Sequence, residues 1–281
     1  MPRLVSSEIP FVSLEGPYWV SNGGYLIFSD VVEGNQKGAT IYRYDPETSS
    51  RPGRFSIVPY PVAPTSTNGL AMDPRGRLLA CERWNGAVTR IEGNSRTVLA
   101  AELGAPNDLA VRSDGNIYFS DTRWGARPSS TAQTAVYRIA PSGETSIVFS
   151  VEMPNGVALS PKGTELYVGS DSQDKVWQLP VAQDGSVGPA LLFTESDRLP
   201  RGTLHVPDGM CVDEQGRVYV ANNSKDVSGI SVFAATGTWL FNVKLPEPPS
   251  NCTFGGADGR TMYITTLHGL YELRVDTPGL P

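Results

Sequence analysis

The sequence lacks a long hydrophobic run and an excess of positive charge, which excludes two broad classes of partner. No window approaches the roughly 18 consecutive apolar residues of a membrane-spanning helix. Residues 1–19 also lack the apolar stretch of a secretory signal. Asp and Glu (29) outnumber Lys and Arg (23), which gives a net charge of −6. Nucleic acids and anionic membranes bind basic surfaces, so neither is expected as a partner. We therefore expect a cytoplasmic protein.

Histidine and cysteine are scarce, which limits the chemistry that a site could use. His205 and His268 leave few ways to form a Ser-His-Asp triad, and no Gly-x-Ser-x-Gly motif is present. For both histidines, a role at the site and an ordinary loop position stay open. Cys81, Cys211 and Cys252 are far apart and form no Cys-x-x-Cys pair. We interpret them as buried small hydrophobic residues in a reducing compartment.

Helical periodicity is nearly absent, whereas strand and turn signals are frequent. Apolar residues alternate with polar ones or form short runs between Gly, Pro, Asn and Asp. The 29 glycines and 23 prolines are scattered along the chain, which indicates many tight turns. The sequence therefore predicts an all-β protein.

One pattern recurs six times. It starts with Asn, Asp or Glu, continues into a short apolar strand and an Asp-x-x-Gly type of turn, and ends in a second strand. Residues 68–81 and 208–221 are two clear copies. The copies start 39 to 53 residues apart, at Glu15, Asn68, Asn107, Asn155, Asp208 and Asn251. Repeats of roughly 40–50 residues with several strands each are typical of β-propellers.

We predict a single domain over residues 1–281, a six-bladed β-propeller with four-stranded antiparallel blades. Further strand-like runs between the copies supply the remaining strands. The run at 269–275 is expected to pair with a strand from residues 3–12, which would close the ring and remove exposed sheet edges. A two-sheet sandwich is the alternative, but it does not need six copies of one pattern.

The six leading residues predict a polar well at the axis of the propeller. Each blade would direct the start of its innermost strand toward the axis, so two carboxylates and four amides would converge there. An oxygen-only cluster suits a hard divalent cation such as Ca²⁺, Mg²⁺ or Mn²⁺. Without a metal, Glu15 and Asp208 would lie close together, and one of them would tend to be protonated.

The same dipeptides also have a purely structural interpretation, because Asn-Gly and Asp-Gly are common in hairpin turns. Three features weaken this interpretation. The dipeptides occupy equivalent positions of the repeat, and Pro106, Pro154 and Pro207 precede three of them. The first copy has Glu15, a residue that a turn would not favour.

Short segments at 15–19, 68–70, 76–82, 106–108, 154–156, 207–210 and 250–256 follow the order of a known family over nearly the whole chain. On these segments the sequence resembles the family of senescence marker protein (regucalcin), gluconolactonases and luciferin-regenerating enzymes. The resemblance implies a six-bladed propeller whose single metal ion is held by Glu15, Asn155 and Asp208. It also implies that Asn107 touches the metal or its bound substrate. Ca²⁺ is the expected ion, with Zn²⁺, Mn²⁺, Mg²⁺ and Fe²⁺ as alternatives.

The activity that the resemblance implies is hydrolysis of a small lactone, with an aldonolactone as one candidate. The metal would polarise the lactone carbonyl, and Asp208 would act as the general base toward water. Two alternatives stay open: a phosphotriesterase-like hydrolase that uses the same metal well, and a non-enzymatic calcium-binding propeller. The oligomeric state, monomer or dimer, is also open.

Two departures from the family pattern bear on specificity. Ala105 stands where the animal members have an Arg that grips the sugar acid. Residues 121–125 read Asp-Thr-Arg-Trp-Gly, where bacterial gluconolactonases often have Asp-Pro-Pro-Tyr-Gly. Arg123 and Trp124 are therefore candidate substrate-binding residues, with an ordinary exposed loop as the alternative. Residues 82 and 83 follow a strand end and are interpreted as loop residues without a role.

Overall fold

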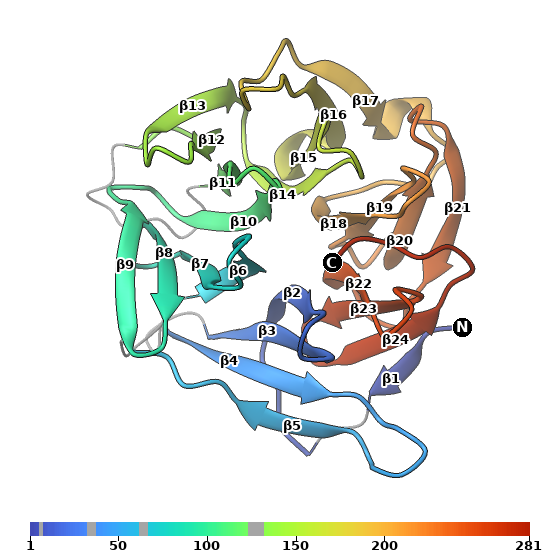
Figure 1. Ribbon diagram of the computed structural model, residues 1–281. Coiled ribbons are helices and arrows are strands. Elements are labelled where there is room, and N and C mark those ends of the chain that lie inside the picture. Colours follow the sequence, from blue (N-terminus) through green and yellow to red (C-terminus); the bar gives the residue numbers. More distant parts are fainter. Residues whose placement is uncertain (6–7, 33–37, 62–66, 123–131) are drawn as a thin grey trace.

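Six four-stranded sheets surround a central axis in the computed structural model (Figure 1). The structure describes residues 1–5, 8–32, 38–61, 67–122 and 132–281. The strands of each sheet are antiparallel, and the first strand of each repeat lies nearest the axis. The prediction of a six-bladed β-propeller is therefore confirmed. Helical structure in the described ranges consists of the short 3₁₀ turns η2 (Asp171–Gln173) and η3 (Ser196–Arg198).

The strands occupy equivalent layers in the six blades. The innermost strands are β2 (Leu14–Val20), β6 (Thr67–Met72), β10 (Pro106–Val111), β14 (Pro154–Leu159), β18 (Pro207–Val212) and β22 (Pro249–Gly255). The second layer consists of β3 (Tyr25–Val32), β7 (Leu78–Glu82), β11 (Ile117–Asp121), β15 (Glu165–Ser170), β19 (Val218–Asn222) and β23 (Thr261–Thr266). The third layer consists of β4 (Gly38–Asp45), β8 (Ala87–Glu92), β12 (Ala135–Ile139), β16 (Lys175–Pro180), β20 (Gly229–Phe233) and β24 (Leu270–Arg274). The outermost strands are β5 (Arg54–Ile57), β9 (Ser95–Ala100), β13 (Thr145–Ser150), β17 (Leu191–Glu195), β21 (Trp239–Lys244) and β1 (Arg3–Val5).

The ring is closed by the N-terminal strand. β1 pairs antiparallel with β24, with Arg3 opposite Glu272 and Val5 opposite Leu270. The first strand of the chain is thus the outermost strand of the last blade (Figure 1). The predicted pairing between the two ends of the chain is confirmed.

The core lies between the blades. All residues of β7, β11 and β19 are buried, whereas β9 and β13 are largely exposed. A strand that is covered on both faces has apolar residues at consecutive positions, and this explains the apolar sequence of the second strand of each repeat. The Asp-x-x-Gly turns also have a physical basis. The Asp73 carboxylate accepts hydrogen bonds from the backbone N–H groups of Arg75 and Arg77 at 2.9 and 3.0 Å.

Each innermost strand is irregular at its leading residue. The pairing register shifts between Glu15 and Tyr18 and at the equivalent place in four other blades, and in β22 it shifts just earlier, between Pro249 and Asn251. The Asn-Gly pairs therefore lie in bulged strands, where a bulge re-aims the side chain, and the hairpin-turn interpretation is wrong. The glycines allow close approach between blades, since a methyl group at Gly156 would lie 2.3 Å from the carbonyl oxygen of Asp208.

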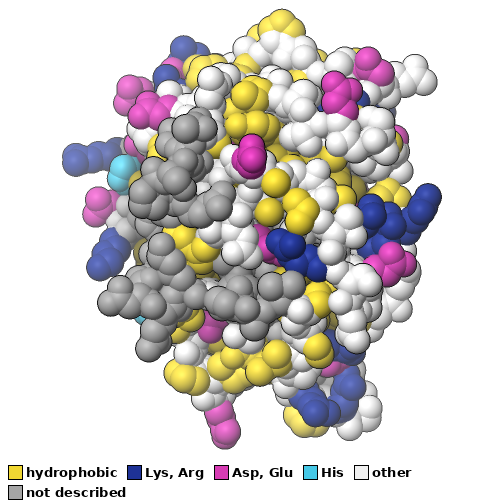
Figure 2. Space-filling view, turned by 90° about the vertical axis from the view of Figure 1, so that its left-hand side faces the viewer, with side chains coloured by type: hydrophobic (Ala, Val, Ile, Leu, Met, Phe, Trp, Pro, Cys, Tyr) yellow, Lys and Arg dark blue, Asp and Glu magenta, His cyan; other side chains and the backbone are white. Residues whose placement is uncertain are grey.

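The surface carries charges of both signs. On the side that corresponds to the left of Figure 1, acidic and basic side chains are scattered between polar and hydrophobic ones (Figure 2). Within the described ranges, the structure contains no helix long and apolar enough to cross a bilayer.

Candidate active site at the propeller axis

The six leading side chains are all buried and lie at the same end of the innermost strands. They are Glu15, Asn68, Asn107, Asn155, Asp208 and Asn251. Contacts between neighbouring blades run through these positions: a methyl group at Gly69 would meet the carbonyl oxygen of Asn107, and one at Gly209 would meet the Asn251 side chain. The fold therefore brings together the residues that the repeat pattern singled out.

The two carboxyl groups strongly disfavour ionisation together. Burial raises the pKa of Glu15 well above its usual value, and the charges of Asp208 and Asp108 raise it further. Burial likewise raises the pKa of Asp208 to about 8. The hydrogen bond from Asn223 Nδ2 to Asp208 Oδ2, 2.7 Å long, partly offsets this rise. Two buried acids whose pKa values are both raised form a site that a cation would stabilise.

The amide oxygens of the well also fit a cation. Asn68 Oδ1 and Asn155 Oδ1 are buried and have no hydrogen-bond partner among the described residues. A buried acceptor without a partner is costly unless a ligand satisfies it. Two carboxylates and neutral carbonyl oxygens are the donors that Ca²⁺ prefers. The residues present therefore fit the divalent cation that the sequence predicts.

Strained backbone occurs two residues before Asn155 and two residues before Asp208. Met153 has φ +45° and Val206 has φ +50°, and each precedes a proline, Pro154 or Pro207. Non-glycine residues rarely adopt this left-handed region, least of all β-branched ones such as Val. Strain of this kind persists where the surrounding structure enforces it, commonly at functional sites. Sequence patterns gave no signal for it.

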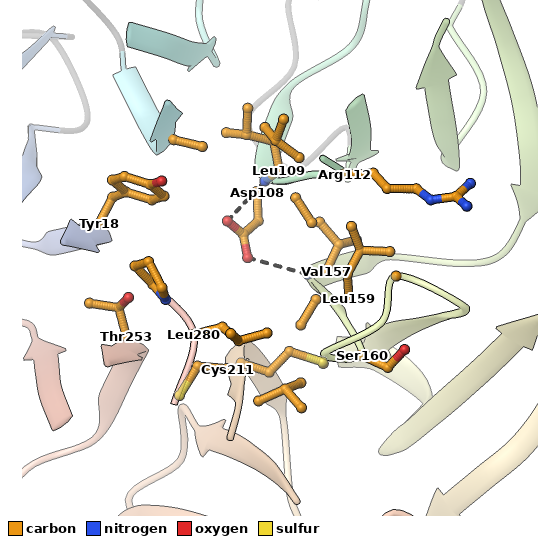
Figure 3. A pocket seen from close by; sticks show the side chains of 18 of the residues that line it. Tyr18, Asp108, Leu109, Arg112, Val157, Leu159, Ser160, Cys211, Thr253 and Leu280 are labelled. Carbon is orange, nitrogen blue, oxygen red and sulfur yellow. Dashed lines mark hydrogen bonds between the residues drawn. The ribbon is translucent and has the colours of Figure 1, made fainter. Parts of the chain in front are cut away.

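Asp108 is a third buried carboxyl group that the repeat pattern did not reveal. It occupies the position that glycine takes in four of the six copies, directly after the leading residue. Its Oδ1 accepts from the backbone N–H of Leu109 at 2.9 Å, and its Oδ2 accepts from that of Val157 at 3.2 Å (Figure 3). Burial raises its pKa to about 6 despite these hydrogen bonds. Asp108 therefore adds a negative potential close to Glu15 and Asp208.

The prediction that Glu82 and Arg83 are loop residues without a role is wrong. Glu82 is fully buried and accepts hydrogen bonds from Tyr60 at 2.8 Å and from Arg96 at 2.6 Å. Arg83 is only 3% exposed, and its guanidinium lies 4.9 Å from the centre of the Trp84 ring. Its charge lowers the pKa of both carboxyl groups in the well. A buried cation therefore faces the site from the end of β7.

The histidines differ in their placement. His205 is partly exposed, and its Nδ1 lies 2.9 Å from Asp174 Oδ2. His268 is exposed. Arg123 and Trp124 lie outside the described residues. Of the two histidines, His205 lies three residues before Asp208 in the chain.

A cavity of about 310 Å³ occupies the axis beyond the well, along the later residues of the innermost strands (Figure 3). Tyr18, Leu109 and Cys211 line it, and Leu280 near the C-terminus extends into it. Backbone hydrogen bonds tie this last segment to the fold, including one from Leu280 N to Val212 O at 3.1 Å. Asp108 and Asn251 line this cavity as well.

Fold and site together define a β-propeller with an oxygen-lined axial well. The model of the family described as SMP-30/gluconolactonase/LRE-like region matches residues 14–268, so the chain belongs to this family. The resemblance inferred from the short segments is thereby confirmed.

Known proteins are similar over nearly the whole chain. A gluconolactonase of Zymomonas mobilis is 26% identical over 99% of this chain and 82% of its own. A pentonolactonase of Haloferax volcanii, XacC, is 27% identical over 91% of this chain and 81% of its own. Among solved structures, a gluconolactonase of Xanthomonas campestris superposes with a TM-score of 0.79 and 28% identity, covering 99% of this chain and 90% of that one.

Proposed function

We propose that this protein is a lactonase that hydrolyses a small sugar lactone with one divalent cation held by Glu15, Asn155 and Asp208. The observation that carries the proposal is the pair of buried carboxyl groups beside a buried amide oxygen that has no other partner among the described residues. The similarity to named gluconolactonases and a pentonolactonase supports the reaction class. We propose Ca²⁺ as the ion, because all donors are oxygens.

The ion, when bound, would act as a Lewis acid that polarises the lactone carbonyl. Glu15 and Asp208 supply two negative charges, and Asn155 supplies a neutral oxygen. Asn107, on the neighbouring blade, contacts the bound lactone. In the reaction, Asp208 accepts a proton from water as the water oxygen attacks the carbonyl carbon. The acyl–oxygen bond then breaks, and the proton passes to the ring oxygen, which leaves as a hydroxyl group.

Asn223 positions Asp208 for this role. Its Nδ2 donates to one carboxylate oxygen at 2.7 Å, which fixes the rotation of the carboxyl group. Each carboxylate oxygen has two acceptor directions, so Asp208 retains capacity for both a cation and a proton.

Arg83 is the proposed substrate-orienting cation. The animal relatives use an Arg at the position of Ala105, and Ala105 cannot bind an anion or a polar hydroxyl group. The buried guanidinium of Arg83 faces the same well from the neighbouring blade. Because Arg presents several donors in one plane, it can bind the oxygens of a sugar lactone.

The proposal is tested by assaying a panel of aldonolactones with chelated and cation-reloaded protein. Activity should disappear on chelation and return with the divalent ion. Asp208→Asn should fold normally and lose about a thousandfold or more in kcat/KM. Asp258→Asn is the matched control, because Asp258 forms an exposed ion pair with Arg274 at 2.7 Å.

Two outcomes would redirect the assignment. Turnover of a phosphotriester but of no lactone would indicate a phosphotriesterase-like enzyme in the same well. One bound ion per chain without turnover of either class would indicate a calcium-binding propeller. Full lactonase activity in metal-loaded Asp208→Asn would refute the role of Asp208.

A further inference from the structure

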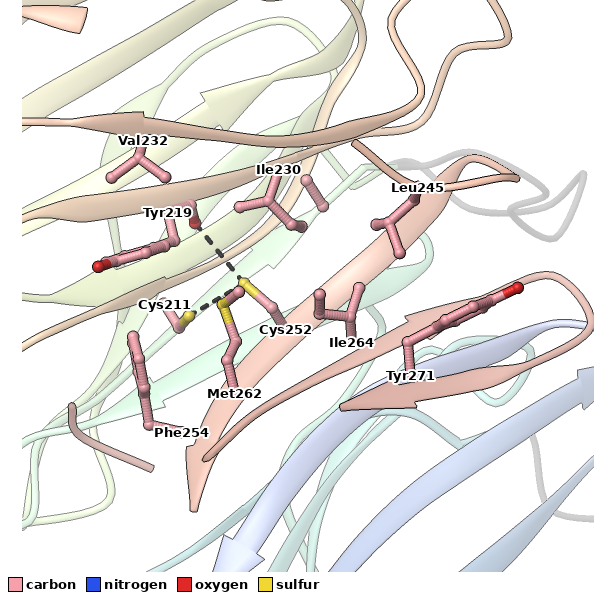
Figure 4. Packing of buried hydrophobic residues seen from close by; sticks show 11 residues of the cluster. Cys211, Tyr219, Ile230, Val232, Leu245, Cys252, Phe254, Met262, Ile264 and Tyr271 are labelled. Carbon is pink, nitrogen blue, oxygen red and sulfur yellow. Dashed lines mark hydrogen bonds between the residues drawn. The ribbon is translucent and has the colours of Figure 1, made fainter. Parts of the chain in front are cut away.

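Two of the three cysteines meet across a blade interface. Cys211 lies on β18 and Cys252 on β22, 41 residues apart in the chain, yet their Sγ atoms are 3.0 Å apart (Figure 4). Both side chains are buried among Tyr219, Ile264 and other members of one hydrophobic cluster. The third cysteine, Cys81, is buried on β7 in a different blade. The sequence gave no sign of this pairing, because neither the spacing nor a Cys-x-x-Cys motif marks it.

We propose that Cys211 and Cys252 form a redox-modification site, in which a small hydroperoxide oxidises the two thiols to a disulfide that links the fifth and sixth blades. The present separation of the sulfurs is about 1 Å longer than an S–S bond of about 2.05 Å. Bond formation therefore requires the two sulfur atoms to approach each other by about 1 Å. The strands themselves already lie side by side around the axis (Figure 1).

The reaction balances with a hydroperoxide as the oxidant. One thiol, as its thiolate, attacks the peroxide oxygen and becomes a sulfenic acid, and the peroxide leaves as an alcohol or water. The second thiol then attacks the sulfenic sulfur, and water leaves as the S–S bond forms. Two thiols and one hydroperoxide give one disulfide, one alcohol and one water.

The axial cavity supplies a route for the oxidant. Both cysteines line this cavity, and its volume of about 310 Å³ accommodates a small peroxide (Figure 3). Burial and the neighbouring thiol raise the pKa of Cys211, so the first step is slow compared with that of an exposed thiol. The second step is favoured because the partner thiol is already in contact. The reduced pair is thus stable until a peroxide accumulates.

The link would join the strands that carry two residues of the well. Asp208 lies three residues before Cys211 on β18, and Asn251 directly precedes Cys252 on β22. The backbone N–H of Cys252 donates to the Asn251 side chain at 2.7 Å. Oxidation would therefore tie the two blades together directly beside the well.

Thiol counting tests the proposal without any reference to lactonase activity. Reduced protein is treated with hydrogen peroxide, desalted, unfolded and titrated for free thiols. Of the three free thiols, one should remain after oxidation, and the intact mass should fall by the mass of two hydrogens. Peptide mapping should recover Cys211 joined to Cys252. Three remaining thiols, or a disulfide that includes Cys81 or joins two chains, would overturn the proposal.

Variants and thermal unfolding make the test independent of a single readout. Cys81→Ala should still form the disulfide, whereas Cys211→Ala and Cys252→Ala should not. Peroxide should raise the Tm of the wild type and of Cys81→Ala by on the order of 10 °C, because the cross-link constrains the unfolded chain. The other two variants should show no rise. An equal response in all four proteins would refute the pairing, whereas loss of lactonase activity would bear only on the proposed function.

Discussion

Asp208 combines three features: it is buried, its pKa is raised to about 8, and one of its oxygens is held by Asn223. A nearby cation strongly stabilises the ionised form of such a buried acid, because the positive charge offsets the loss of solvation. The nearby charges of Asp171 and Asp108 raise the pKa of Asp208 further and increase this demand. Arg83 supplies a part of the positive charge, but a single guanidinium leaves a net negative potential.

Replacement of Asn223 tests the orientation of Asp208. In Asn223→Leu, the amide donor is lost and the carboxylate can rotate, so we expect kcat/KM to fall by about 10- to 100-fold with the fold intact. Addition of cation should restore only a part of this loss. Asn94→Ala is the control, because Asn94 is exposed in a distant turn. Unchanged activity in Asn223→Leu would show that this hydrogen bond has no role in positioning.

Replacement of Arg83 tests substrate orientation. Arg83→Gln should raise KM for a sugar lactone by about tenfold or more, while cation affinity should stay the same or increase because a positive charge is lost. Steady-state kinetics and a cation titration on the same variant separate these effects. A fall in cation affinity with unchanged KM would contradict the assigned role.

Cation binding should be coupled to protons. Without a cation, burial holds the pKa of Asp208 at about 8, so this carboxyl group binds a proton near neutral pH. Binding of the cation must displace this proton. Calorimetric titrations near pH 7 in buffers with different ionisation enthalpies should report about one proton released per ion from Asp208. Apparent affinity should rise as the pH increases toward 8. The release of no proton would be inconsistent with these ligands.

At the scale of the strand, the bulges and the glycines beside them form the site. Gly156→Ala would place a methyl group against the Asp208 carbonyl, so we expect a loss of stability of about 1–3 kcal/mol and a clear fall in activity. Gly76→Ala is the matched control. Gly76 has φ +75° with open space around it, so its substitution strains the backbone without touching the well. Denaturant unfolding and kcat/KM should therefore separate the two variants.

The sequence was sufficient for the strand positions and for the leading residues, because the repeat fixes both. The repeat did not predict Asp108, because this residue occupies a position that is glycine in most copies. It did not predict Arg83 either, because the position of Arg83 depends on how the chain continues after β7. The left-handed backbone at Met153 and Val206 and the contact between Cys211 and Cys252 depend on packing between blades. Local sequence patterns carry no information about such packing.

At the scale of the molecule, the pairing of β1 with β24 closes the ring, and the ring brings acidic groups together at the axis. The second effect costs stability when no cation is bound. As pH rises above the unfolded-state value of 3.8 for Asp208, the unfolded chain ionises while the native state retains the proton. Stability is therefore lost progressively until the pH exceeds about 8.

Thermal unfolding of chelator-treated protein tests this cost. The wild type should have a lower Tm near pH 8 than near pH 5, and cation should abolish most of the difference. Asp208→Asn should have a higher Tm than the wild type near pH 8 in chelator, because it removes a buried charge. A wild-type Tm that rises over this interval without cation would contradict the electrostatic description of the well.

The most direct measurement is lactone hydrolysis during stepwise return of a divalent cation to metal-free protein, with bound ion quantified at each step. We predict that activity rises in proportion to bound ion and saturates at one ion per chain, and that Glu15→Gln neither retains the ion nor gains activity. Full hydrolysis in the metal-free protein, or a fully loaded protein that leaves every lactone intact, would contradict the account.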